Sequence, residues 1–159
     1  MSQLLFKLDQ FTSQISKGIL IITVPSLVIL VFTSVLGRFV FSATPHFIEE
    51  TSRYFLIWTG ALGASVAVRT GDFIHVEAFQ KLFSPKVNSI LERTSSLIVI
   101  LFLLFLFIGG LGVSWQQKSQ MAATLPISMM WPTLAIPVSA VLMLPHYLLV
   151  LLSKKEVKS

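Results

Sequence analysis

Residues 97–115 read LIVILFLLFLFIGGLGVSW, an apolar run without a charged side chain. The hydrocarbon core of a bilayer is about 30 Å thick and needs roughly 20 residues of helix to cross it. We therefore expect a transmembrane helix over residues 95–116. The run shows no alternation of apolar and polar residues, which argues against a closed β-barrel.

Three further apolar segments flank this run. The first contains Pro25 and the last contains several prolines, which we expect to bend or interrupt a helix. The resulting fold class is an all-α integral membrane protein with four transmembrane helices, forming a single membrane domain over residues 1–159. The expected spans are 18–40, 45–69, 95–116 and 129–152. In the loop between the second and third spans, apolar residues at helical spacing within 73–83 predict an amphipathic helix lying in the membrane interface.

Composition supports this class. Of 159 residues, 54% are hydrophobic and only 12% are charged, and the mean hydropathy is +0.82; such values do not occur in ordinary soluble domains. The absence of cysteine excludes disulfides and thiolate chemistry. The formal charge of +5 does not indicate nucleic acid as a partner, because the basic residues flank apolar spans.

The distribution of basic residues predicts the topology. Nine of the twelve Lys and Arg residues lie in the N-terminal segment, the loop between spans two and three, and the C-terminal segment. The positive-inside rule then places both termini in the cytoplasm. A cleaved signal peptide is the competing interpretation of the first span, but its apolar run is long for that and no small-residue cleavage site follows.

Ionisable residues cluster where the second span begins. Such groups are costly at membrane depth and tend to face protein partners or water. A solvated helix start, a polar contact with another membrane subunit and a proton relay all remain open, and spacing also allows Arg53 to pair with either acid within the helix. The candidate contact residues are Arg38, Glu49, Glu50 and Arg53.

Small residues recur at helical spacing on the same span and would let another helix approach closely. They are Gly60, Gly63, Ala64 and Ala67. The approaching helix could belong to this chain or to a partner. Gly109, Gly110 and Gly112 in the third span could likewise contact a helix of this chain or of a partner, or they could provide local flexibility.

Catalytic patterns are missing. The three histidines, His46, His75 and His146, lie in separate segments without metal-ligand spacing, and no serine lies in a nucleophile-elbow motif. We expect no enzyme activity, no metal and no cofactor in this chain. Transport by the chain alone is also disfavoured, because carriers hold solutes with polar groups near the midplane; a small transporter or channel acting as a homo-oligomer is the alternative function.

An ordered set of short motifs between Arg38 and Leu144 resembles the small, DctQ-like membrane subunit of tripartite ATP-independent periplasmic (TRAP) transporters. The matching residues are Glu49-Glu50-x-x-Arg53-Tyr54, Trp58, Leu62-Gly63-Ala64, Arg69-x-Gly71-Asp72-x-Ile74-x-Val76-Glu77, Gln120, Leu125-Pro126-Ile127 and Trp131-x-x-x-Ala135-Ile136-Pro137. His75 and Ser84-Pro85 depart from the family pattern.

The resemblance implies a division of labour in the bacterial inner membrane. A periplasmic protein captures an organic acid such as sialic acid or a C4-dicarboxylate, and a large membrane subunit transports it with sodium. The small subunit binds the large one and helps the binding protein to dock. This implies that neither sodium nor substrate binds to residues of this chain.

Overall fold

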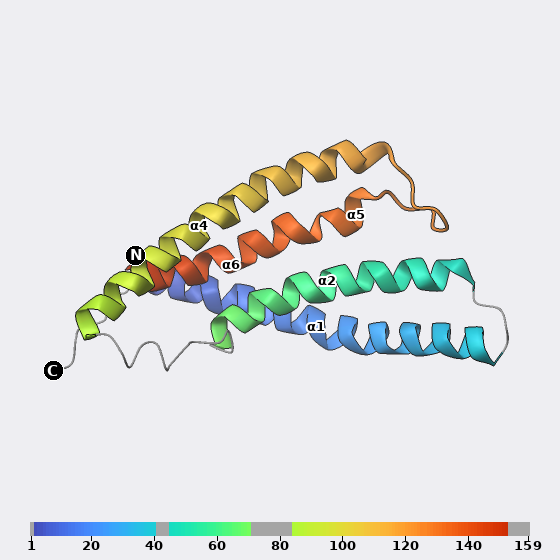
Figure 1. Cartoon of the computed structure of the whole chain (residues 1–159), viewed down its shortest axis with the longest axis horizontal. Helices are drawn as coiled ribbons and strands as arrows, with labels where there is room; N and C mark the ends of the chain where they lie inside the picture. The colour runs from blue at the N-terminus through green and yellow to red at the C-terminus, as the bar shows by residue number, and fades with distance from the viewer. Residues whose placement is uncertain (1, 41–44, 71–83, 153–159) are drawn as a thin grey trace.

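The computed structural model describes residues 2–40, 45–70 and 84–152, and these residues form long helices running side by side (Figure 1). The first helix, α1 (Ser2–Phe39), is continuous over 38 residues, with Pro25 inside it. At 1.5 Å per residue it is about 57 Å long, so residues 2–17 extend the first apolar segment as helix.

The remaining helices are α2 (His46–Thr70), α4 (Pro85–Gln116), the 3₁₀ turn η1 (Gln117–Ser119), α5 (Met130–Thr133) and α6 (Ala135–Leu152). Successive long helices, α1, α2, α4 and α6, run in alternating directions (Figure 1), with the short η1 and α5 between α4 and α6. Helix α6 is central, since it packs against α1, α2 and α4, while α1 and α2 pack against each other. We call the end where α1 begins and α6 ends the terminus end, and the opposite end the hairpin end (Figure 1).

A short hairpin over residues 120–129 connects η1 to α5. Met121 and Ser128 form an isolated antiparallel bridge, and the amide of Ala122 donates to the carbonyl of Ile127 at 2.9 Å. Helix α5 is a single turn that α6 continues after Leu134. The proline-rich entry to the last apolar segment therefore forms a hairpin and a short helical turn before the long helix begins.

The expected helical membrane architecture is confirmed. Among the described residues, three helices are long and apolar enough to cross a bilayer: Gln3–Phe39, Arg93–Ser119 and Met130–Leu152. Helix α2 has 25 residues but is less apolar and is not one of the three. The count of four spans therefore stays a prediction, and the expected interfacial helix at 73–83 lies outside the described residues.

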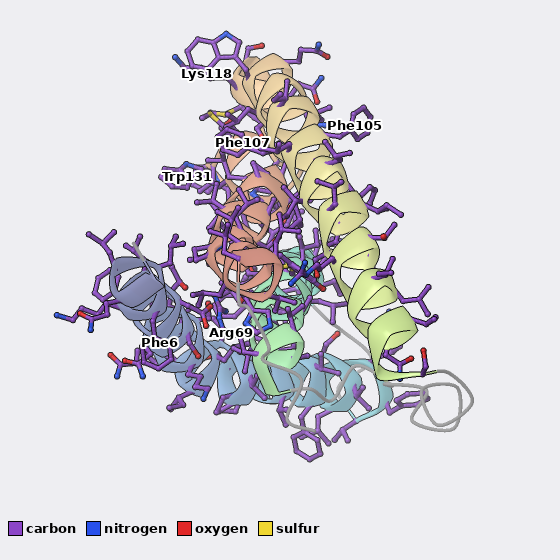
Figure 2. All side chains as sticks on the ribbon, turned by 90° about the vertical axis from the view of Figure 1, so that its left-hand side faces the viewer. Phe6, Arg69, Phe105, Phe107, Lys118 and Trp131 are labelled. Carbon is purple, nitrogen blue, oxygen red and sulfur yellow. The ribbon has the colours of Figure 1, made fainter. Side chains whose placement is uncertain are left out.

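Small and polar side chains form much of the core, together with the larger Leu62, Ile100 and Leu103. Buried serines lie on α1, α2, α4 and α6, and the Ser65 hydroxyl donates to that of Ser16 at 2.9 Å, joining α2 to α1. Small residues let membrane helices pack closely where lipid supplies no hydrophobic force. Large apolar side chains instead face outward, such as Phe105, which is 72% exposed and extends away from α6 (Figure 2).

Gly110 lies where α4 and α6 approach each other closely. A Cβ built at Gly110 would lie 2.9 Å from Cδ of Pro137 on α6, whereas nothing lies within 4 Å at Gly109 or Gly112. Of these three glycines, only Gly110 is required by a contact inside the chain.

Candidate functional site

At the hairpin end, Arg38 and Glu49 join the last turn of α1 to the first turn of α2. The Arg38 guanidinium donates to Oε1 of Glu49 at 2.5 Å. The Arg38 side chain is 66% exposed and that of Glu49 is 29% exposed. This ion pair is therefore open to its surroundings and fixes the relative position of the two helix ends.

Glu50 binds the hairpin. Its carboxylate accepts hydrogen bonds from the amides of Ala123 at 3.0 Å and Thr124 at 2.7 Å, and from the Thr124 hydroxyl. The Tyr54 hydroxyl, one turn along α2, donates to Glu50 at 2.7 Å and lies 3.1 Å from the sulfur of Met129. A carboxylate with several donors is well suited to hold a loop, because charged acceptors form the stronger hydrogen bonds.

Arg53 has a different environment. It is exposed, and within residues 2–40, 45–70 and 84–152 it forms no ion pair: Glu49 binds Arg38 and Glu50 binds the hairpin. The pairing within the helix that spacing allowed is therefore replaced by contacts to other elements.

The small residues of α2 lie away from the core. Leu62 and Ser65 are buried, and at about 100° per residue Gly60, Gly63, Ala64 and Ala67 lie on the other side of the helix. Gly60 is exposed, and the other three are partly buried. A Cβ at Gly60 or Gly63 would meet nothing within 4 Å. In the described part of the chain, no helix occupies the space beside these two glycines.

The terminus end holds a second polar cluster, centred on Arg69 at the end of α2 (Figure 2). Arg69 is 7% exposed in its side chain and donates to Asp9 Oδ1 at 2.7 Å. It also donates to the Thr12 hydroxyl at 2.7 Å and to the carbonyl of Leu142 on α6. One guanidinium thus joins three helices.

His146 completes this cluster, with Nδ1 3.5 Å from Oδ2 of Asp9. Pro145 lies just before it and lacks an amide hydrogen, so the Val141 carbonyl, next to the Leu142 carbonyl that Arg69 binds, has no helical donor. The sequence analysis did not predict this cluster around Arg69. Its signals in the sequence are an acid in the N-terminal segment, an arginine in a family motif and a histidine without metal-ligand spacing.

The described residues contain no group of three or more His, Cys, Asp or Glu side chains that could hold a metal ion. Several of their charged groups instead join helix to helix or helix to loop, namely Asp9, Arg38, Glu49, Glu50 and Arg69. Fold and site together define a helical integral membrane protein whose polar side chains mainly hold its own elements in place.

Comparison with known proteins identifies the family. Residues 27–155 match the family described as tripartite ATP-independent periplasmic transporters, DctQ component, and this chain belongs to that family. It is also 28% identical over 120 residues to the sialic acid TRAP transporter permease protein SiaT of Haemophilus influenzae strain 86-028NP. That match covers 75% of this chain and 19% of the relative, so the chain spans about a fifth of the relative's length.

Proposed function

We propose that this chain is the non-catalytic small membrane subunit of a sodium-coupled TRAP transporter in the bacterial inner membrane. Membership of the DctQ family supports a role as a transporter component. The relative named as a sialic acid permease favours sialic acid over a C4-dicarboxylate as the imported organic acid. Sodium and substrate then bind to the large subunit and the periplasmic binding protein.

The observation that carries this proposal is the outward face of α2. Gly60, Gly63, Ala64 and Ala67 lie opposite the buried side of the helix, with open space beside the two glycines. Such a face permits the backbone of another helix to approach, and helix association in membranes depends on such close contacts. We assign it to the large subunit, which this chain braces.

In this proposal, the charged residues predicted for partner contacts have two roles: holding the hairpin in place and forming part of the end where the binding protein docks. Glu50 holds the hairpin 120–129 at the hairpin end, and the Arg38–Glu49 pair lies beside it. We assign this end to the periplasmic side, where it helps the loaded binding protein to dock.

Four spans follow from the same proposal. Helix α2 is about 37 Å long at 1.5 Å per residue, lies along α1 and α6, and places Arg69 at the end opposite Glu49. With α2 crossing the bilayer, both termini lie in the cytoplasm, as the positive-inside rule requires.

Co-purification of the large subunit tests the assignment. We expect Gly63→Leu to reduce the amount of large subunit recovered with the tagged chain and to reduce sialic acid uptake, because leucine blocks the approach of a partner helix. Gly18→Leu is the matched control, since nothing lies within 4 Å of a Cβ there either. Equal recovery for the two variants, or saturable transport by the chain alone as a homo-oligomer, would contradict the proposal.

A further inference from the structure

A cavity of about 310 Å³ lies between the hairpin ends of α1 and α2. Its polar rim is formed by Arg38, Glu49 and Arg53, and its apolar wall by Val31, Val35 and Phe39 of α1. Its rim includes the Arg38–Glu49 pair of the hairpin end, but the cavity is separate from the hairpin that Glu50 binds and from the small-residue face further along α2.

The rim carries more positive than negative charge. Two guanidinium groups line the cavity with one carboxylate, and that carboxylate binds Arg38 through a single nitrogen. Ser52, which also lines the cavity, donates its hydroxyl to the carbonyl of Ile48 at 2.7 Å. Arg53 and the remaining N–H groups of Arg38 are thus the donors that the described residues leave for a ligand, and a guanidinium matches phosphate oxygens in a bidentate geometry.

The apolar wall of the cavity extends from its charged rim along α1 into the hydrocarbon core of the membrane. Val31 precedes Arg38 by seven residues, about 10 Å along the helix, and Val31 and Val35 are each 46% exposed on a helix apolar enough to span the bilayer. A ligand filling the cavity would meet cations at one end and exposed aliphatic side chains along its length. This pattern fits an amphiphile with an anionic head, rather than a soluble anion or a peptide.

We propose that this cavity binds an anionic phospholipid of the leaflet at the hairpin end. The headgroup phosphate lies between Arg53 and Arg38, and an acyl chain follows Val35 and Val31. The lipid neutralises an arginine that has no ion-pair partner among the described residues and lies close to the hydrocarbon, where isolated charge is costly. The site belongs to this chain alone and needs neither the large subunit nor a transported solute.

The test measures lipid binding to the full purified chain in detergent, with phosphatidylglycerol and phosphatidylcholine as probes. We expect phosphatidylglycerol to bind about fivefold more tightly, the preference typical of one basic side chain near an anionic headgroup. Arg53→Gln removes this preference, whereas Arg53→Lys retains most of it. Lys118→Gln is the matched control, because Lys118 is an exposed cation at the same end that stacks on Trp115 at 4.7 Å.

A second variant probes the apolar wall. Val35→Trp fills the cavity while leaving both arginines in place, so we expect weaker binding of both lipids. Equal affinity of the unaltered chain for the two lipids would overturn the proposal. Displacement of phosphatidylglycerol by excess inorganic phosphate would also overturn it, since the site would then bind a free ion. Melting temperatures of all variants identify any loss of binding caused by unfolding.

Discussion

At the residue scale, the Arg69 side chain joins three helices at the terminus end. It contacts Asp9 and Thr12 of α1 and the carbonyl of Leu142 on α6. Removing one member of a buried ion pair leaves the other without compensation and costs about 3 kcal/mol. We therefore expect Arg69→Gln to lower the thermal stability of the purified chain markedly, as measured by its melting temperature in detergent.

Arg93→Gln is the control for this change, because Arg93 is exposed near the start of α4. A charge at the surface contributes little to stability, so this variant should melt close to the unaltered chain. A similar melting temperature for both variants would show that the contacts of Arg69 do not hold the three helices together.

Glu50 supports a second prediction at this scale, which concerns the hairpin. Glu50→Gln replaces one acceptor oxygen with an NH₂ group facing the donors of Ala123 and Thr124, so the hairpin should loosen. Hydrogen exchange at these two amides should become several-fold faster, because bonds to a charged acceptor are lost. Glu49→Gln, whose carboxylate binds Arg38 instead, should leave the exchange unchanged; equal rates in both variants would refute the role of Glu50.

Contacts between residues far apart in the chain could not be predicted from the sequence. Glu50 binds Thr124, 74 residues away, and Arg69 binds Asp9, 60 residues away. Spacing within a helix indicates only neighbours three or four positions apart, so it suggested Arg53 as the partner of the two acids. The sequence predicted correctly that the cluster is polar and lies at a helix start, but it contained no signal for the distant partners.

At the element scale, the contact of α4 with α6 depends on Gly110. An added methyl group at Gly110 would lie 2.9 Å from the Pro137 ring, which is rigid and cannot turn aside. Overpacking of this kind costs about 1–3 kcal/mol, more than the gain of up to about 1 kcal/mol from replacing glycine in a helix. We expect Gly110→Ala to lower the melting temperature.

Gly109→Ala and Gly112→Ala are controls on the same helix. Neither position has an atom within 4 Å of an added Cβ, so only the helix-propensity gain applies and stability should stay the same or rise. A drop of equal size at all three positions would indicate that glycine provides flexibility in α4 rather than close packing.

The apolar helices themselves were predictable, since hydropathy is a local property of the chain. Residues 97–115 lie inside α4, and Pro126 and Pro132 come before the long helix α6. Which face of each helix is buried was not predictable, because every face of these segments is apolar. Gly110 and Gly109 look alike in the sequence, and only the position of Pro137 distinguishes them.

At the scale of the whole molecule, the arrangement of helices constrains the topology. Helices α1 and α2 lie side by side, as do α4 and α6, and the described chain reverses direction between successive long helices (Figure 1). If α2 crosses the bilayer, the start of α4 lies on the same side as the start of α1. If α2 does not cross, these two points lie on opposite sides.

Because this chain has no cysteine, single introduced cysteines can distinguish the topology in which α2 crosses the bilayer from the one in which it does not. We expect single cysteines in Gln3→Cys and Val87→Cys to react with a membrane-impermeant maleimide only after the cells are permeabilised, because both positions lie at the terminus end. Ala123→Cys, in the hairpin, should react in intact spheroplasts. Each site is exposed, so the reaction reports which side of the membrane it occupies. Opposite labelling of positions 3 and 87 would exclude α2 as a span, and with it the topology on which the proposed docking surface depends.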